Sequence, residues 1–213
     1  MRITGIHYGI LRIPLRTPFK TALRTVETIE DVIVGIETDT GHIGFGEAPP
    51  TVAITGDSLE SILEALRGSI GPALLGRDIL AIDGNCQTVQ NAVLKNTSAK
   101  AAAEIALYDL FAQQAGKPLY QVLGGGQPRL ITDLTISAND TDTMLYDCES
   151  ALERGFTALK IKVGKDVGDD IARLQAIRAA VSGRASLRID ANQGWSAEQT
   201  ISVMRTLESG GEP

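Results

Sequence analysis

Cysteine and histidine, the side chains that most often build zinc sites, are rare in this sequence. Two of each occur in 213 residues. Cys86 and Cys148 are too far apart for the spacing of a zinc site, and they indicate no disulfide framework. His7 and His42 also lack partners at ligand spacing, so we expect both to be structural. We therefore predict a reducing, cytoplasmic setting.

Long apolar runs and an excess of positive charge are also missing. No run approaches the roughly 20 apolar residues of a membrane span, and the first four residues do not resemble the start of a signal peptide. The net charge of −6 argues against nucleic acid or an acidic membrane as a partner. A hydrophobic content of 43% with 22% charged residues is typical of a globular protein with a sizeable core.

Residues 1–50 show the two-residue alternation of β-strands. The alternation covers residues 3–15, 31–38 and 42–47, and Asp39-Thr40-Gly41 predicts a hairpin turn between the last two strands. Residues 17–25 follow neither the strand period nor the helix period. Such a loop is either a plain connector or a mobile lid that carries binding residues.

Helical periodicity follows the predicted strands. Ser58 can cap a helix that Gly71-Pro72 interrupts, and a longer, alanine-rich helix is predicted for residues 98–115. Three strands followed by helices indicate that residues 1–120 form a small α+β domain.

From residue 121 onward, strand and helix patterns alternate. Strands are predicted at residues 130–137, 157–163 and 185–190, and the helices that follow them at residues 142–154, 169–181 and 196–209. The last helix is predicted to open with a capping box formed by Ser196 and Gln199 and to stop at Gly210. Units of roughly 25–30 residues are the size of a parallel βαβ repeat. Both a doubly wound sheet and a (β/α) barrel are built from such repeats.

The phase of these three strands distinguishes the two architectures. One face of each strand is apolar, and the opposite faces carry Asp133, Thr135, Ser137, Lys160, Lys162, Ser186, Arg188 and Asp190. A doubly wound sheet should be apolar on both faces, whereas a barrel can keep a polar interior near its C-terminal mouth. We therefore predict that residues 121–213 form the first three βα units of an incomplete TIM-type barrel.

Lys160 and Lys162 point the same way because side chains two apart lie on one face of a strand. An isolated pair of this kind is more often the solvated face of an edge strand. Asp190, however, ends the next strand and is a good oxygen ligand for Mg²⁺. Neighbouring ammonium groups disfavour each other's protonation, so we expect one lysine to act as a base nearer neutral pH. This combination suits proton abstraction α to a carboxylate, with enediolate stabilisation by the metal.

At these residues the sequence resembles the enolase superfamily, its muconate-lactonising subgroup, and within that the dipeptide epimerases of the L-Ala-D/L-Glu type. The motifs that carry the resemblance are residues 17–25, 46–50, 54–57, 98–102, 107–109, 159–164 and 190–195. The resemblance implies a Mg²⁺-dependent isomerase that epimerises dipeptides, with an α+β capping domain over the mouth of the barrel.

The resemblance also implies roles for individual residues. Lys162 matches the acid/base on one face of the α-carbon, and Lys160 matches its electrostatic partner at the substrate carboxylate. Asp190 matches the first Mg²⁺ ligand, and Arg24 matches the residue that binds the glutamate-side carboxylate. Positions that close around the substrate are matched by Phe19, Ile54 and Thr135. Packing within the capping domain explains Phe19 and Ile54 equally well.

The chain departs from the family in length, since a complete barrel needs eight βα units and three are predicted here. In the family, the opposing lysine and the remaining metal carboxylates come from later units. We therefore expect this chain to lack epimerase activity by itself, and we expect the full-length enzyme to be a homo-oligomer. Glu212 follows two glycines without a preceding strand, and we assign it no ligand role.

Other functions remain open at this point. The same fold could catalyse another reaction of the subgroup, such as cycloisomerisation or o-succinylbenzoate formation. A catalytically incomplete fragment or binding module, and a Schiff-base lysine aldolase, are the remaining alternatives.

Overall fold

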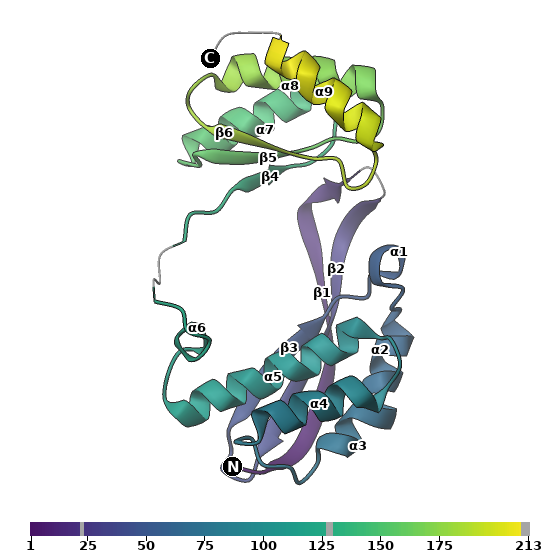
Figure 1. Ribbon diagram of the computed structural model, residues 1–213, viewed down its shortest axis with the longest axis vertical. Helices are drawn as coiled ribbons and strands as arrows, with labels where there is room; N and C mark the ends of the chain where they lie inside the picture. Colours follow the sequence, from purple (N-terminus) through teal and green to yellow (C-terminus); the bar gives the residue numbers. More distant parts are fainter. Residues whose placement is uncertain (22–23, 127–129, 210–213) are drawn as a thin grey trace. The chain divides into compact units, whose positions relative to one another are not determined.

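The computed structural model describes residues 1–21, 24–126 and 130–209, which form two compact units (Figure 1). The first unit comprises Met1–Pro14 and Thr28–Pro128, and the second comprises Leu15–Glu27 and Arg129–Pro213. In the described part of the chain, no helix has the length and apolar character needed to cross a membrane.

A three-stranded sheet of order β1-β2-β3 is formed by β1 (Ile3–Lys20), β2 (Thr25–Thr38) and β3 (Ile43–Ala48). β2 and β3 pair antiparallel across the predicted turn at residues 39–41, with Val34 opposite Gly46. Alternation buries Val32, Val34 and Ile36 on the face that packs in the core. The predicted hairpin and the three strands are confirmed.

The prediction of a loop at residues 17–25 is wrong for most of that segment. β1 continues to Lys20 and β2 begins at Thr25, while residues 22 and 23 lie outside the described residues. The side chains here are mostly exposed or half-buried, so neither face needs to be apolar. Pairing between the backbones makes these residues strands, and such pairing leaves no hydrophobic period in the sequence.

The helices of the first unit are α1 (Val52–Thr55), α2 (Leu59–Ala65), the π-helical turn η1 (Leu66–Ile70), α3 (Gly71–Leu74), α4 (Ile82–Ala92), α5 (Thr97–Ala115) and α6 (Leu119–Val122). Ser58 caps α2 as predicted, because its side chain accepts a hydrogen bond from the Ser61 amide. The prediction that Gly71-Pro72 interrupts this helix is wrong. Pro72 lies in the first turn of α3, where its missing N–H costs little. The π-helical turn before it changes the hydrogen-bonding pattern, so that the chain continues as a helix through Gly71.

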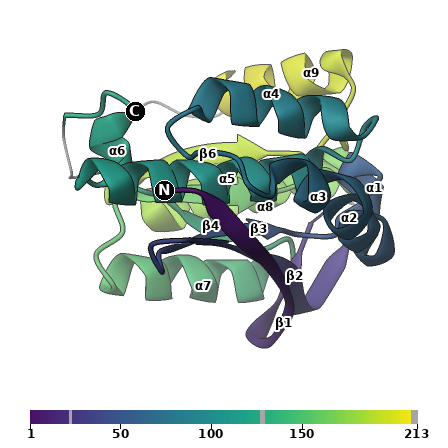
Figure 2. The same ribbon diagram turned by 90° about the horizontal axis from the view of Figure 1, so that it is seen from below.

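Helix α5 packs unusually close to β3, and Figures 1 and 2 show α4 and α5 on the same side of the sheet. A Cβ atom on Gly46 would lie 1.9 Å from the carbonyl oxygen of Ala102, and one on Gly44 would lie 2.3 Å from that of Ala106. Both alanines are fully buried. Small residues on both elements therefore bring the two backbones into direct contact.

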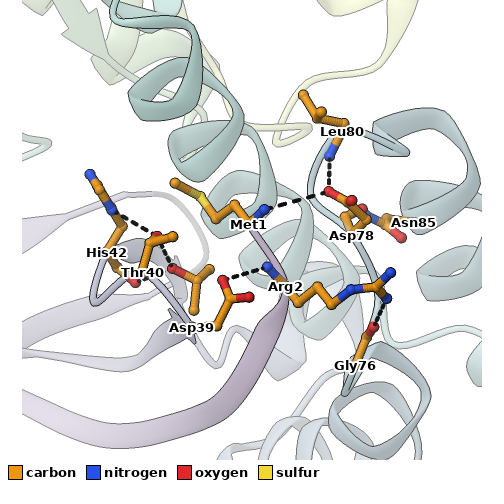
Figure 3. Close-up of polar contacts among 10 residues, drawn as sticks. Met1, Arg2, Asp39, Thr40, His42, Gly76, Asp78, Leu80 and Asn85 are labelled. Atoms are coloured by element: carbon orange, nitrogen blue, oxygen red, sulfur yellow. Dashed lines mark hydrogen bonds and ion pairs between the residues drawn. The ribbon is translucent and has the colours of Figure 1, made fainter.

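The beginning of β1 is held by polar contacts on both sides (Figure 3). The Arg2 amide donates to Asp39 Oδ1 at 2.8 Å, and its guanidinium donates to the Gly76 carbonyl at 3.1 Å. The Met1 ammonium lies 4.0 Å from Asp78, which also accepts from the Leu80 amide. These contacts join the first strand to the β2–β3 turn and to the segment that follows α3.

The second unit repeats strand and helix three times, as predicted. Its elements are β4 (Leu134–Ile136), α7 (Thr141–Glu153), β5 (Ala158–Lys162), α8 (Val167–Val181), β6 (Ser186–Asp190) and α9 (Ala197–Ser209), and the sheet is parallel with order β4-β5-β6. The predicted capping box of α9 is confirmed, since Ser196 and Gln199 exchange two hydrogen bonds. β4 is shorter than predicted, and the predicted stop at Gly210 lies outside the described residues.

The contact between β3 and α5 predicts that Gly46→Ala destabilises the first unit. The added methyl group would overlap the Ala102 carbonyl, so the helix must move away from the sheet. We expect the free energy of unfolding, measured by urea denaturation, to fall by at least about 1–3 kcal/mol.

The control is Gly9→Ala, in exposed β1, where a Cβ atom would meet nothing within 4 Å. This variant should stay within about 0.5 kcal/mol of the wild type. Equal stability of the two variants would contradict the close approach.

Candidate active site

The parallel register of the second unit brings the polar side chains of three strands together. Thr135 lies opposite Lys160, and Lys160 lies opposite Arg188. One step further along, Lys162 lies opposite Asp190. Because the carboxyl ends of parallel strands share one edge of the sheet, Lys162 and Asp190 lie at the edge where the loops into α8 and α9 begin.

The carboxylate of Asp190 is shared by both lysines. Its Oδ2 accepts a hydrogen bond from Lys162 Nζ at 2.7 Å, and Lys160 Nζ lies 2.8 Å from the same oxygen. Its Oδ1 accepts from the Asn192 amide at 2.9 Å. The side chain of Lys162 is 7% exposed and that of Lys160 is 35% exposed. The ammonium group of Lys162 has less contact with water, so it depends more on Asp190 to compensate its charge.

This arrangement shifts the pKa values of Asp190 and Lys160. Hydrogen bonds from Lys160 and Lys162 hold the pKa of the Asp190 carboxyl well below its usual range, against the opposing effect of partial burial. The hydrogen bond to Asp190 raises the pKa of Lys160. A raised pKa is the opposite of what a base near neutral pH needs, so Lys160 is not the lysine expected to take that role. A carboxylate in contact with both ammonium groups outweighs their mutual repulsion.

Asn192 is a further member of the cluster that sequence reasoning did not assign. Its Oδ1 accepts a hydrogen bond from Lys162 Nζ at 2.8 Å. Asn192 and Gln193 both adopt left-handed backbone conformations, with φ of 47° and 65°. Asparagine tolerates the left-handed conformation better than most residues. An asparagine shortly after a strand that ends in a carboxylate is therefore the sequence signal that could have identified Asn192.

The tip of the β1–β2 hairpin belongs to the same unit and lies beside this cluster. The ring of Phe19 has its centroid 5.9 Å from Lys162 Nζ, within the range of a cation–π contact. Lys20 bonds to the segment after β4 through its amide, carbonyl and ammonium, with Ser137, Ala138 and Asn139 as partners. Sequence reasoning missed Lys20.

The remaining predicted site residues lie on β4, at the hairpin tip and in α1. Thr135 is half-buried on β4, opposite Lys160. Arg24 is exposed at the hairpin tip, and its backbone bonds to Thr21. Ile54 lies in α1 of the first unit and is 66% exposed, so the alternative of a buried packing role for it is wrong. Glu212 lies outside the described residues.

The described residues fit one ligand of a Mg²⁺ site. Asp190 offers an anionic oxygen whose low pKa keeps it ionised, and the amide oxygen of Asn192 lies beside it, both bonded to Lys162. Among residues 1–21, 24–126 and 130–209, no three His, Cys, Asp or Glu side chains form a group that could hold a metal. Mg²⁺ in proteins usually takes one or two carboxylates together with water and substrate oxygens. Asp190 fits that role as a single ligand.

Two protein families match successive parts of the chain. Residues 8–124 match the mandelate racemase / muconate lactonizing enzyme N-terminal domain, and residues 143–211 match the enolase C-terminal domain-like family.

Curated relatives of the chain include two L-Ala-D/L-Glu epimerases. The protein of Bacillus subtilis is 49% identical over 212 residues and that of Clostridium acetobutylicum is 46% identical over 211 residues. Both matches cover 99% of this chain, but only 58% and 59% of the relatives. The chain therefore spans less than two thirds of the length of these relatives.

Solved structures of related enzymes also match nearly all of this chain and less than two thirds of their own length. A substrate-liganded complex of the Bacillus subtilis L-Ala-D/L-Glu epimerase matches with a TM-score of 0.97 and 48% identity, covering 99% of this chain and 59% of that one. A dipeptide epimerase from Enterococcus faecalis, complexed with Mg and L-Leu-L-Tyr, matches with a TM-score of 0.94 and 37% identity, covering 99% and 59%. A muconate lactonizing enzyme from Mucobacterium Smegmatis matches with a TM-score of 0.92 and 28% identity, covering 98% and 57%.

The shared carboxylate makes stability depend on pH in a defined direction. The pKa of Asp190 is depressed in the folded state, so its stabilisation is present above the unfolded value of about 3.9 and is lost as the pH falls through the folded value. In EDTA-containing buffer, Asp190→Asn should therefore lower the free energy of unfolding more at pH 7 than at pH 3. Denaturant unfolding at both pH values measures the difference.

Glu208→Gln, which removes an exposed carboxylate from α9, is the control for the loss of one negative charge. A deficit for Asp190→Asn that is the same at both pH values would show that the carboxylate charge does not stabilise the lysine pair.

Proposed function

Because the chain belongs to the mandelate racemase / muconate lactonizing enzyme family, we propose that it forms part of a Mg²⁺-dependent dipeptide epimerase of the L-Ala-D/L-Glu type. The fold is an α+β capping domain followed by the first part of a (β/α) barrel. We place the boundary between them near residue 120. The observation that carries the proposal is the contact of both Lys160 and Lys162 with the carboxylate of Asp190.

Lys162 is the proton-transfer group in this proposal. In its neutral form, Nζ takes the proton from the α-carbon of the dipeptide residue that is epimerised, and the C–H electron pair moves toward the adjacent carboxylate to give an enediolate. The 7% exposure of the side chain keeps water away from the amine, and Asn192 and Asp190 fix the position of Nζ. Lys160, two residues earlier on the same face of β5, places a second positive charge beside the substrate carboxylate.

Asp190 would hold the Mg²⁺ ion through its carboxylate. When bound, the ion supplies positive charge that stabilises the enediolate. The low pKa of Asp190 supports this role, because the carboxylate stays ionised at every pH at which a lysine base is useful.

The hairpin tip and β4 supply the substrate-binding groups of the proposal. Phe19 borders the reaction centre through its contact with Lys162, and Thr135 lies next to Lys160 in the sheet. The exposed Arg24 would form a bidentate pair with the side-chain carboxylate of a glutamate-containing dipeptide. Ile54 is proposed as a further substrate-binding residue because of its match to the family motif and its 66% exposure.

Epimerisation also requires a base on the opposite face of the α-carbon. Lys162 serves one face. Lys160, the other lysine in contact with Asp190, projects from the same face of β5 and therefore does not supply the opposing base. We propose that the opposing base and the other metal carboxylates lie outside this chain, which spans 58% of the length of the Bacillus subtilis relative. A cytoplasmic location, supported by the free thiols of Cys86 and Cys148, and a homo-oligomer of the full-length enzyme complete the proposal.

Another proton abstraction of the same subgroup is the second candidate. It is favoured by the likeness to a muconate lactonizing enzyme at 28% identity. This candidate would be supported if no dipeptide exchanged its α-hydrogen and a cycloisomerase substrate were turned over.

The proposed base predicts the effect of Lys162→Ala on hydrogen exchange. With the protein at its natural length, Mg²⁺ and L-Ala-L-Glu in D₂O, the variant should incorporate deuterium at the glutamate α-carbon about 10²–10⁴-fold more slowly than the wild type. Proton NMR of the α-hydrogen follows the exchange.

Lys117→Ala, which removes an exposed lysine after α5, is the matched control and should exchange at the wild-type rate. Undiminished exchange by Lys162→Ala would refute the assignment of the base.

The single carboxylate predicts weak metal binding by the 213-residue chain alone. Titration calorimetry with MgCl₂ should give a small, weak signal that Asp190→Asn abolishes, because the other ligands would be water. Tight binding that survives the substitution would place the metal elsewhere and contradict the role of Asp190.

A further inference from the structure

Asp170 on α8 is a buried carboxylate that the proposed reaction does not use. The residue is 0% exposed. Its Oδ2 accepts hydrogen bonds from the Gly164 amide at 2.8 Å and from the indole Nε1 of Trp195 at 3.1 Å. Its Oδ1 accepts from the Arg173 guanidinium at 2.6 Å. Three donors therefore converge on one carboxylate in the interior of the second unit.

Two of these donors come from the loops that carry the site. Gly164 lies two residues after Lys162, in the loop between β5 and α8. Trp195 follows Asp190 and Asn192 in the loop between β6 and α9. Asp170 is thus hydrogen-bonded to both loops, although it contacts neither Lys160, Lys162 nor Asp190.

The two loops also contact each other through their backbones. Gly164 has φ of 110°, and a Cβ atom on it would lie 2.3 Å from the Ala191 carbonyl oxygen. A Cβ atom on Gly194 would lie 2.2 Å from the Gly164 carbonyl oxygen. With so little space between them, one loop cannot shift without moving the other.

Only a carboxylate satisfies the three donors around this position. Ionised aspartate is an acceptor at both oxygens, whereas the asparagine amide presents an acceptor on one side and an NH₂ donor on the other. In Asp170→Asn, the NH₂ group must therefore face either Arg173 or the pair formed by Gly164 and Trp195. At least one buried donor loses its partner in an otherwise isosteric variant.

We infer that Asp170 is a positioning residue for the lysine–carboxylate cluster. By fixing Gly164 and Trp195 to one point, it sets the distance from Lys162 on β5 to Asp190 at the end of β6 and to Asn192 in the loop that follows. Its consequence for catalysis rests on the proposed function, whereas its consequence for the geometry of the loops does not.

The geometric part is tested on the 213-residue chain, where Trp195 is the single tryptophan. In Asp170→Asn, the indole loses the anionic acceptor in either orientation of the amide and keeps at best a neutral oxygen, so the fluorescence emission should shift to longer wavelength and acrylamide should quench it more strongly. Amide hydrogen exchange at Gly164 should accelerate. In a crystal structure of the variant, the separation of Lys162 Nζ and Asp190 Oδ2, now 2.7 Å, should exceed hydrogen-bonding distance.

The catalytic part is tested with the protein at its natural length. Substitution of residues that orient a site from outside typically costs 10–100-fold, so kcat for α-hydrogen exchange by Asp170→Asn should fall by about that factor. KM should change less than about threefold, because the proposed substrate-binding groups Arg24, Phe19 and Thr135 lie on other elements. Each rate is divided by the folded fraction, determined by circular dichroism.

Asp169→Asn is the matched control, since Asp169 is the exposed neighbour of Asp170 on the same helix. It should leave the fluorescence, the exchange at Gly164 and kcat at wild-type values. If Asp170→Asn does not fold, Trp195→Phe takes its place. This variant keeps the aromatic packing, removes one of the three donors, and should lower kcat in the same direction by a smaller factor.

Two outcomes overturn the inference. One is a folded Asp170→Asn protein with unchanged Trp195 emission, Gly164 exchange and Lys162–Asp190 distance. The other is a variant that is less stable but has a wild-type kcat per folded molecule, which would make Asp170 purely structural. Absence of exchange in the wild-type protein with every dipeptide would refute the proposed function, and the geometric measurements would still decide the role of Asp170.

Discussion

The second unit depends on one carboxylate shared between two ammonium groups. Lys162 is nearly buried, and a buried ammonium group without a partner is costly. Asp190 provides that partner from the neighbouring strand, and the Asn192 side chain completes the environment of Lys162 Nζ. The lysine pair can exist on this strand because the next strand ends in an acid.

This contact in turn depends on the register of the parallel sheet. A shift of one residue would turn Lys160 and Lys162 toward the helices and bring Ile161 to the polar face. Leu159, Ile161 and Val163 prevent this, because all three are almost completely buried in the core beneath α7 and α8. Hydrophobic alternation therefore fixes the polar geometry, and the loops tied to Asp170 preserve it beyond the ends of the strands.

The sequence predicts the parts of the structure that rest on periodicity and on local capping. The alternation in β5 and β6 indicated the polar face, and Ser58 and Ser196 indicated where helices begin. Three features left no such signal. Helix α4 begins after Ala81 without a side-chain cap, and Pro72 lies in a helical turn made possible by the π-helical turn before it. The hairpin arms near Lys20 are extended through pairing and contacts with distant residues, which no local pattern encodes.

The hairpin tip has a consequence for the time course of folding. Lys20 and Ser137, which form one of its hydrogen bonds, are 117 residues apart in sequence. During synthesis, the tip therefore leaves the ribosome long before its partners exist, and closing so long a segment is slow. In that interval β1, an edge strand, is open to pairing with strands of other nascent chains. Pro14 and Pro18 lie within β1 and have no amide hydrogen to donate, so they protect the waiting hairpin from aggregation.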